Sequence, residues 1–149
     1  MLKSTSIETP LGALYAIADE EALIQLEFDS ESDIPEGNLP PLVSIKKELE
    51  AYFSKKLTRF KTPVRLHGTP FQVEVWEALQ RIPYGQTCSY VDIAKKLGHP
   101  RAYRAVGNAN GCNSLAIIIP CHRVISADGT LGGYGSGLHR KEWLLKLES

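Results

Sequence analysis

The chain has 149 residues, enough to bury a hydrophobic core in one compact unit or in two small lobes, but too few for further domains. Its 17 basic and 17 acidic residues cancel, so the composition gives no sign of the broad basic surface that marks many nucleic-acid-binding proteins. Any contact with DNA is therefore expected to be local.

The cysteines and the apolar runs bear on where the protein works. Three cysteines without a Cys-x-x-Cys pair argue against a disulfide framework and favour a reducing compartment. Residues 1–5 begin no apolar signal segment, and no run approaches the roughly 20 apolar residues that a membrane-spanning helix needs. We therefore expect a soluble, cytoplasmic protein that contacts no membrane.

The first part of the chain is predicted to be rich in strands. Short apolar stretches over residues 4–28 are separated by two turn sequences, a pattern that predicts an antiparallel meander of three strands. Residues 29–41 are acidic and contain three prolines, so we expect a connector that continues neither sheet nor helix. A helix is expected over about residues 42–53. Together these elements predict a strand-rich lobe over residues 1–67.

Residues 68–149 are predicted to form a second, helical lobe. Thr69 offers an N-capping hydroxyl and Pro70 fits the first turn of a helix. That helix should end before the turn at Pro83, because proline opposes continuation. The expected fold class is therefore α/β in the α+β sense, with a small strand-rich N-terminal lobe and a helical C-terminal lobe.

The C-terminal lobe also has the pattern of a helix-turn-helix. Ser89 can cap a helix with Asp92 three residues later, and residues 98–100 should end that helix. Residues 101–109 are then expected to form a second short helix after a tight turn.

The second of these helices carries little side-chain bulk. Arg101 and Arg104 supply its charge, and its small residues are Ala102, Ala105, Gly107 and Ala109. Such a helix suits contacts with the backbone and shape of DNA, whereas a reader of the major groove would present more Arg, Asn or Gln side chains to base edges. Tight packing against another helix would explain the small residues equally well.

Cys121 is the best candidate for a reactive group. The apolar run over residues 115–119 is expected to be a buried strand that ends at Pro120 and delivers the thiol to a fixed place. A neighbouring histidine such as His122 can help to generate the reactive thiolate. In an extended chain the two side chains would point to opposite faces, so a turn or a bridging water is required. The alternative is an inert buried cysteine, against which the flanking proline, histidine and arginine argue.

Three stretches of this lobe closely resemble the O6-alkylguanine-DNA alkyltransferases. They are Pro120-Cys121-His122-Arg123-Val124, Arg104-Ala105-Val106-Gly107 upstream and Lys141-Glu142-Trp143-Leu144-Leu145 downstream. The resemblance runs with compatible spacing from about residue 71 to 148, whereas the first lobe matches only in size and strand-rich character. It implies a ribonuclease H-like lobe over residues 1–67 and a helix-turn-helix alkyltransferase domain over residues 68–149.

The same resemblance implies the reaction. Cys121 would attack the alkyl carbon of O6-alkylguanine in DNA, with O4-alkylthymine as a further candidate substrate, and would keep the alkyl group as an S-alkylcysteine. Because no step returns the thiol, the protein would act once. The resemblance implies no cofactor, and His67 and His139 have no companions at metal-ligand spacing, so no metal site is expected.

Two residues are implied to activate the thiol. By resemblance, His122 is the base that is linked to Cys121 through water, and Glu148 is the carboxylate that orients and polarises His122. Glu142 is a rival for the second role, but the spacing to the family favours Glu148. The alternative for Glu148 is a solvated position at the end of the C-terminal helix.

Two further residues are implied to support catalysis. Asn113 would tie the turn before the active-site segment to backbone groups, a role that overlaps with an ordinary Asx-turn. Ser114 follows it where many members of the family have proline, so the turn should be less rigid. Tyr90 would assist rotation of the phosphate and donate a hydrogen bond to the base, although a packing role at a helix start is the simpler alternative.

Reaching O6 inside a duplex requires the nucleotide to rotate out of the helix. By resemblance, Arg104 would fill the space left by the extruded base while its helix lies in the minor groove; a solvated Arg104 is the alternative. The neighbouring residues expected at the DNA surface are Arg101, Ala102, Ala105 and Gly107. We expect a monomer on double-stranded DNA.

The substrate pocket is expected to involve the glycine-rich stretch over residues 132–137, although such a stretch can also be a plain mobile loop. Tyr134 would form an aromatic wall, and the backbone N–H of Gly135 would replace the contact of a serine in some members. Val124 and Pro120 are expected to complete the lining.

Three other functions compete with this interpretation. Alkyltransferase-like proteins bind damaged DNA without transfer, but they lack the acceptor cysteine that is present here. A cysteine hydrolase would regenerate its thiol, but the sequence offers no obvious substrate site for one. An alkylation-sensing transcription factor would need a regulatory module for which 149 residues leave no room.

Overall fold

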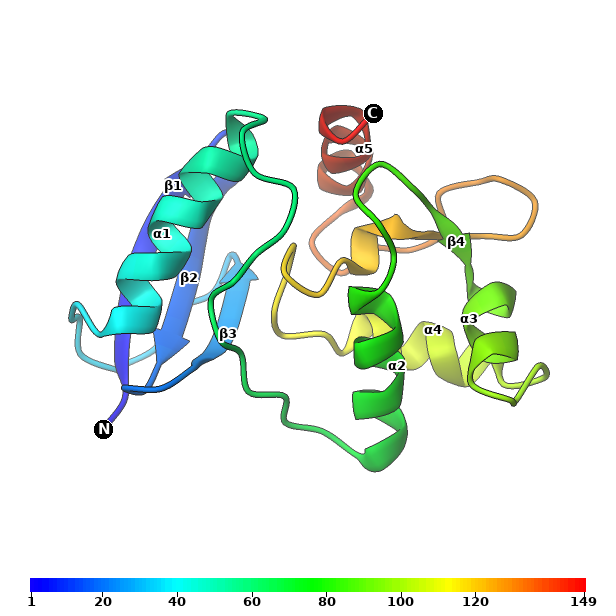
Figure 1. Ribbon diagram of the computed structural model, residues 1–149, viewed down its shortest axis with the longest axis horizontal. Coiled ribbons are helices and arrows are strands. Elements are labelled where there is room, and N and C mark those ends of the chain that lie inside the picture. Colours follow the sequence, from blue (N-terminus) through cyan, green and yellow to red (C-terminus); the bar gives the residue numbers. More distant parts are fainter. The chain divides into compact units, whose positions relative to one another are not determined.

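The computed structural model describes residues 1–149 and divides into two compact units, Met1–Leu66 and His67–Ser149 (Figure 1). This division falls one residue before the boundary expected from the sequence. No helix in either unit combines the length and the apolar character that crossing a membrane requires. The antiparallel sheet in the first unit and the helices of the second confirm the expected α+β fold class.

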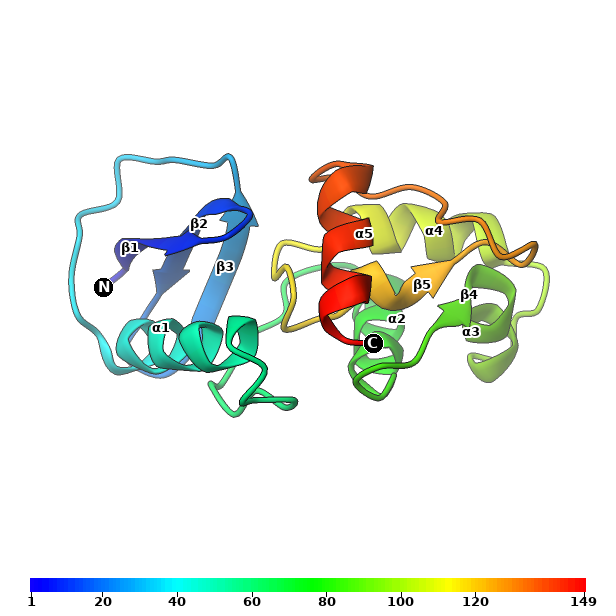
Figure 2. The same ribbon diagram turned by 90° about the horizontal axis from the view of Figure 1, so that it is seen from above.

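The first unit consists of a three-stranded sheet and one helix. Its strands are β1 (Lys3–Thr9), β2 (Gly12–Ala18) and β3 (Leu23–Phe28), which are paired in the order β1-β2-β3. Both pairs are antiparallel, so the predicted meander is confirmed. The helix α1 (Pro40–Phe53) packs across one face of this sheet (Figures 1 and 2).

The core of this unit follows from helical spacing on α1. Leu42, Ile45, Leu49 and Tyr52 recur every three or four residues and are all buried, which places one apolar stripe against the sheet. The helix begins at Pro40, two residues before the expected start, because proline fits the first turn, where its missing N–H has no partner to lose.

The acidic connector between β3 and α1 differs from expectation in one respect. We expected it to continue no sheet, but Glu36 forms a parallel bridge with Ser4 of β1. The Ser4 N–H donates to the Pro35 carbonyl at 2.9 Å, and the Gly37 N–H donates to the Ser4 carbonyl at 3.1 Å. Proline lacks only the backbone donor, so its carbonyl can still accept a bond from an edge strand.

The second unit is mainly helical. Its elements in chain order are α2 (Pro70–Gln80), β4 (Cys88–Ser89), α3 (Tyr90–Lys96), α4 (Tyr103–Gly111), the 3-10 turn η1 (Cys121–Arg123), β5 (Val124–Ile125) and α5 (Leu138–Leu147). The strands β4 and β5 form a short parallel pair that the sequence did not predict, because each strand has only two residues.

Capping side chains set the starts of two helices as predicted. Thr69 accepts a bond from the Gln72 backbone while Gln72 accepts one from the Thr69 backbone, and Ser89 and Asp92 form the same reciprocal arrangement. Trp76 of α2 is buried and donates to the Ala109 carbonyl at 2.9 Å, which joins α2 to α4.

The helix-turn-helix is present as α3 and α4, but its second helix begins later than expected. Residues 101 and 102 form a turn, and the Ala102 N–H donates to the His99 carbonyl at 2.9 Å. As a result α4 starts at Tyr103 and continues to Gly111 instead of ending at residue 109.

The segment before Cys121 is buried as predicted, but it is not a strand. Ile117 has a φ of 71°, and the Ile118 N–H donates to the Ala116 carbonyl at 2.8 Å across a tight turn. The Ile119 N–H donates to the Leu115 carbonyl at 3.0 Å. Local turns therefore satisfy backbone groups that a strand would have paired with a neighbour, and the apolar run reflects burial alone.

Candidate functional site

Cys121 is the first residue of η1 and is 7% exposed. The amide nitrogen of Asn113 donates to its sulfur at 3.3 Å. Burial raises the pKa of the Cys121 thiol, while the Asn113 hydrogen bond, the charge of Lys141 and the nearby Tyr134 hydroxyl each lower it by less. The net effect keeps the resting thiol protonated, so a reaction at this sulfur needs a base.

His122 and Glu148 form a buried pair next to this thiol. Nε2 of His122 lies 2.8 Å from Oε2 of Glu148, and the two side chains are 0% and 1% exposed. An ionised carboxylate can only accept, so Nε2 carries the proton and Nδ1 presents its lone pair. That Nδ1 is buried and makes no hydrogen bond within the chain, and no direct bond joins it to Cys121.

The electrostatics of His122 suit a neutral imidazole. Burial lowers the pKa of His122, and the neighbouring Glu148 carboxylate opposes this effect only in part. A neutral ring with a free nitrogen can accept a proton at neutral pH.

Arg123 also binds the Glu148 carboxylate, and the sequence did not predict it as a site residue. Its Nε and Nη2 donate to Oε1 and Oε2 of Glu148 at 2.7 and 2.9 Å, a bidentate arrangement. Its Nη1 donates to the Ile82 carbonyl at 2.8 Å, and its guanidinium lies 5.7 Å from the centre of the Tyr84 ring. The only sequence signal was its place in the motif, immediately after His122.

The end of α5 fixes where Glu148 lies. Glu148 is the C-cap of α5 and is 4% exposed, so it does not occupy the solvated position considered as an alternative. Gly85 approaches its backbone so closely that a Cβ would lie 3.0 Å from the Glu148 carbonyl, and Gly85 has a φ of 81°. Glu142, the rival carboxylate, is exposed and pairs with Lys146 at 3.1 Å, away from His122.

Asn113 organises the turn that carries the thiol. Its Oδ1 accepts from the Leu115 N–H at 2.9 Å, and its Nδ2 donates to the Ile119 carbonyl at 2.9 Å. The same amide group therefore closes an Asx-turn, binds the backbone before Cys121 and contacts the sulfur. Asn110 of α4, which the sequence did not single out, donates to the Cys121 carbonyl at 3.5 Å.

Lys141 is a second residue that the sequence reading missed. Its side chain is fully buried, and Nζ donates to the carbonyls of Val124 at 2.6 Å, Gly133 at 3.0 Å and Leu131. Burial lowers the pKa of Lys141 to about 8. The three bonds tie β5 to the glycine-rich loop, and only the matched Lys-Glu-Trp stretch hinted at this role.

Two tyrosines from different segments lie near the thiol. Burial and the charge of Cys121 raise the pKa of Tyr134 well above its usual range, and burial raises the pKa of Tyr90. Gly132 has a φ of 72°, and a Cβ there would lie 3.0 Å from the Tyr90 hydroxyl, so the loop meets α3 closely. The structure thus brings Tyr90 and Tyr134 to the site.

The remaining predicted pocket residues are divided between the interior and the surface. Pro120 and Val124 flank η1 and are buried, with Val124 paired to Cys88 of β4. Gly135 is exposed, and a Cβ there would lie 4.0 Å from the Gly111 carbonyl.

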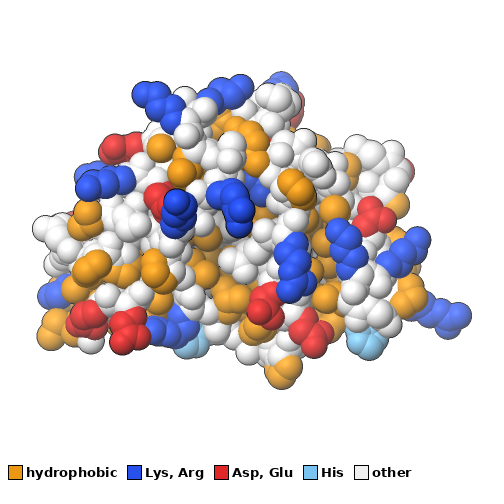
Figure 3. Space-filling view, in the orientation of Figure 1, with side chains coloured by type: hydrophobic (Ala, Val, Ile, Leu, Met, Phe, Trp, Pro, Cys, Tyr) orange, Lys and Arg blue, Asp and Glu red, His pale blue; other side chains and the backbone are white.

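The helix-turn-helix presents a basic surface. Residues 95–104 contain four basic residues and no acidic one, namely Lys95, Lys96, Arg101 and Arg104, all of them exposed. Figure 3 shows basic side chains gathered over α3 and the turn that follows it. The unit as a whole has nine basic and six acidic residues, so the neutral total conceals a positive C-terminal unit.

The exposed face of α4 carries Arg104 together with Tyr103 and Asn108, and its other exposed residues are small. Arg104 is exposed and forms no ion pair, and Ala105 and Gly111 on the exposed side carry little or no side chain. Ala102 and Gly107 are half-buried, and a Cβ at Gly107 would meet only the Tyr90 ring at 3.8 Å. Val106, Ala109 and Asn110 form the buried face. The Arg104 side chain is therefore available to contact a binding partner.

Comparison with known proteins identifies the family of the chain. Residues 70–149 match the family described as 6-O-methylguanine DNA methyltransferase, DNA binding domain, and residues 2–66 match its ribonuclease-like domain. The chain is similar to the methylated-DNA–protein-cysteine methyltransferase of Mycobacterium bovis, with 57% identity over 99% of this chain and 93% of the relative. It is also 49% identical to the protein of that name from Methanosarcina barkeri, over 95% and 94% of the two chains.

A solved structure supports the same assignment. The crystal structure of Mycobacterium tuberculosis OGT in complex with DNA superimposes with a TM-score of 0.92 and 44% identity, covering 98% of this chain and 92% of that one. With both family domains matched and close relatives aligned along nearly their whole length, this chain belongs to the 6-O-methylguanine DNA methyltransferase family.

Proposed function

We propose that this protein repairs O6-alkylguanine in DNA by moving the alkyl group irreversibly to its own Cys121. The observation that carries the proposal is the buried series of Cys121, His122 and Glu148, in which an ionised carboxylate orients a neutral histidine beside a protonated thiol. The names of the similar proteins supply the substrate class, a methylated base in DNA.

The proton of the thiol leaves first or in concert with attack. Nδ1 of His122 takes this proton, directly or through one bridging water, and Glu148 stabilises the imidazolium that forms. Arg123 holds the carboxylate ionised and in place by its two bonds to Glu148. Asn113 stabilises the thiolate by its bond to sulfur.

The transfer itself is a displacement at the alkyl carbon. The bond between Sγ of Cys121 and the alkyl carbon forms as the bond from that carbon to O6 breaks. The electron pair stays on guanine, which takes up one proton, and Tyr90 donates a hydrogen bond to the base as it gains charge. The product is a neutral thioether that no group in the site is placed to cleave, so each molecule acts once.

The burial of the thiol determines how DNA must bind. Cys121 is only 7% exposed, so a base within a stacked duplex cannot reach it and the damaged nucleotide must rotate out. The exposed face of α4 lies in the minor groove in this proposal, and Arg104 fills the space left by the base. Arg101, Ala102, Ala105 and Gly107 then lie at or beside the DNA backbone, with one protein monomer bound at each lesion.

The rotated base enters next to the glycine-rich loop. Tyr134 forms one wall of the pocket, the backbone N–H of Gly135 binds the base, and Val124 and Pro120 shape the side near η1. O4-alkylthymine presents an alkyl group on a similar exocyclic oxygen, and we include it as a second substrate.

The decisive experiment measures the mass of the intact protein after incubation with duplex DNA that contains one O6-methylguanine. We expect one methyl group on the wild-type protein, mapped to Cys121, and none on Cys121→Ala. Selective binding of the damaged duplex without any gain in mass would instead identify a damage sensor. Repeated turnover with a free thiol at the end would indicate hydrolase chemistry.

A further inference from the structure

Charge is strongly segregated within the unit Met1–Leu66. Residues 4–45 contain nine acidic residues and no lysine or arginine. Residues 46–65 contain seven basic residues and only two acidic ones, Glu48 and Glu50. The last third of this unit, which comprises the C-terminal part of α1 and the segment that follows it, is therefore locally positive although the unit as a whole is negative.

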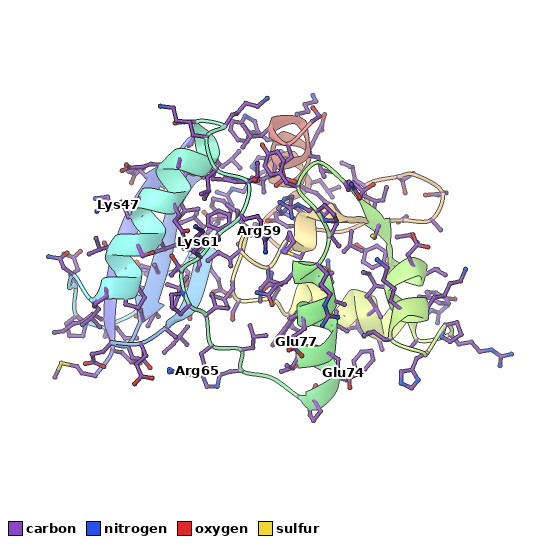
Figure 4. The ribbon with its side chains drawn as sticks, viewed as in Figure 1. Lys47, Arg59, Lys61, Arg65, Glu74 and Glu77 are labelled. Carbon is purple, nitrogen blue, oxygen red and sulfur yellow. The ribbon has the colours of Figure 1, made fainter.

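Three of these basic side chains form what we call the N-terminal basic surface, namely Lys47, Arg59 and Lys61. All three are exposed and none forms an ion pair. Figure 3 shows basic side chains over α1 and the segment after it, with acidic side chains among them, and Figure 4 labels these three. Arg65 differs, because it is paired with Asp19 and Glu21.

Glu48 reduces the positive charge of this surface, but its carboxylate is also bound to the backbone of the segment that follows α1. Its Oε2 accepts from the Lys61 backbone N–H at 2.7 Å, and its Oε1 accepts from the Thr62 N–H at 2.9 Å and from the Thr62 hydroxyl. Both carboxylate oxygens are thus used to hold the segment against α1. The Lys61 side chain is exposed and forms no ion pair.

The segment that carries Arg59 and Lys61 is anchored at several points. The Ser44 and Thr62 hydroxyls lie 2.7 Å apart, and Val64 forms a parallel bridge with Leu23 of β3. The Leu23 N–H donates to the Pro63 carbonyl at 2.8 Å. The backbone that carries these basic side chains is therefore held in place. Binding through them loses less conformational entropy than binding through a flexible tail would.

Stabilisation of the α1 macrodipole does not explain all of this positive charge. Lys55 and Lys56 follow the C-terminus of α1, where positive charge stabilises the helix macrodipole. Arg59 and Lys61 lie beyond that helix in a segment without regular structure. Glu50, exposed three residues after Lys47, and the half-buried Glu48 are the acidic residues among residues 46–65.

We propose that Lys47, Arg59 and Lys61 bind the phosphate backbone of DNA. DNA carries about one negative charge per 1.7 Å, and lysine and arginine contacts with phosphates add affinity without reading sequence. The inference rests on the proposed function only in requiring that the protein binds DNA.

The test is the salt dependence of binding to an undamaged duplex of about 26 base pairs, two and a half helical turns. Fluorescence anisotropy would give the affinity of the full chain at several salt concentrations. For K47Q/R59Q/K61Q we expect the slope of log affinity against log salt to become shallower by about 2 to 3, since each phosphate contact contributes about 0.9. The charge-preserving control, K47R/R59K/K61R, should keep the wild-type slope.

The outcomes separate the proposals. Equal slopes for the wild type and K47Q/R59Q/K61Q, with both proteins folded by their melting temperatures, would overturn the N-terminal basic surface as a DNA contact. Weaker binding with an unchanged slope would also overturn it. A loss of affinity seen only at high protein concentration would overturn it as well, because it would identify the acidic residues 4–45 of a second copy as the partner. A wild type that binds no duplex would remove the proposed function as well.

Discussion

Nε2 of His122 and Oε2 of Glu148 lie 2.8 Å apart in the interior of the C-terminal unit, although 25 residues separate them in the chain. Arg123 binds both oxygens of the same carboxylate. The buried Glu148 carboxylate is therefore shared between the His122 imidazole and the Arg123 guanidinium. This shared carboxylate links the stability of the unit to its chemistry.

Replacing Glu148 by Gln should damage both properties. The substitution leaves the Arg123 guanidinium buried without its opposite charge, so we expect a loss of about 3 kcal/mol in the free energy of unfolding. His122 also loses the group that stabilises its charged form, so the rate of transfer to Cys121 should fall about a hundredfold. Urea unfolding and single-turnover kinetics on O6-methylguanine duplex would measure the two effects.

Glu142→Gln is the matched control for this substitution. Glu142 lies on the same helix, but its side chain is 55% exposed and pairs with Lys146 at the surface. Its loss should change stability by no more than about 0.5 kcal/mol and leave the transfer rate unchanged. Equal effects of the two variants would contradict the assignment of Glu148.

Stability should decrease in mild acid because of His122. Burial lowers the pKa of His122 in the folded protein, so the unfolded chain binds its proton more readily. The contribution of His122 is therefore complete above the unfolded pKa of about 6.5 and is lost as the pH falls below it, by at most about 1.4 kcal/mol per pH unit.

Urea unfolding between about pH 7.5 and pH 5.5 would measure this slope. Three carboxyl groups have lowered pKa values, namely those of Asp19, Asp92 and Asp128. Their stabilising contributions are lost only at more acidic pH, so they do not affect the slope between about pH 7.5 and pH 5.5. His122→Gln should flatten the dependence, whatever its effect on absolute stability. An unchanged slope in that variant would assign the acid sensitivity to another group.

Lys141 should hold the glycine-rich loop in place. Lys141→Met removes a donor from the Val124, Leu131 and Gly133 carbonyls, and we expect a loss of about 1 to 3 kcal/mol in stability. Hydrogen exchange at residues 131–134 should become faster, and transfer should slow because Tyr134 is less well placed. Lys146→Met, at a position that is 77% exposed, should change neither measurement.

Arg104→Ala should separate base rotation from chemistry. The side chain is exposed and unpaired, so the melting temperature should change little. Extruding a base from a duplex costs a few kcal/mol, and losing the group that fills its place should slow transfer about tenfold or more on double-stranded DNA. A single-stranded oligonucleotide with the same lesion should react at nearly the wild-type rate, and an equal loss on both substrates would exclude this role.

Alkylation of Cys121 should destabilise the protein. Cys121 is 7% exposed and its sulfur lies against Asn113, so one added methyl group crowds a packed site. We expect a loss of about 1 to 3 kcal/mol, visible as a lower melting temperature after stoichiometric reaction with damaged duplex. Cys121→Ala treated with the same DNA is the control, and an unchanged melting temperature in the alkylated wild type would refute the prediction.

Local features of the fold could be predicted where neighbouring residues decide them. The capping of α2 by Thr69 and of α3 by Ser89 depends on side chains within three residues, and both were identified from the sequence. The apolar run at residues 115–119 was correctly expected to be buried but wrongly expected to be a strand. Apolar composition reports burial, whereas a strand also needs continuous pairing with a neighbour, and only Leu115 of this run lies in a β-bridge.

The sequence by itself predicted the helix-turn-helix and the family, and it singled out Cys121 and His122 as candidate site residues, because short contiguous stretches carry these signals. Only the tertiary structure showed that Glu148 is buried, that Arg123 shares its carboxylate and that Lys141 joins β5 to the loop. These interactions join groups up to 25 residues apart, and the pKa shifts that follow depend on how completely packing removes water from them. Residue spacing cannot encode that exclusion of water, which arises when the helices and turns pack together.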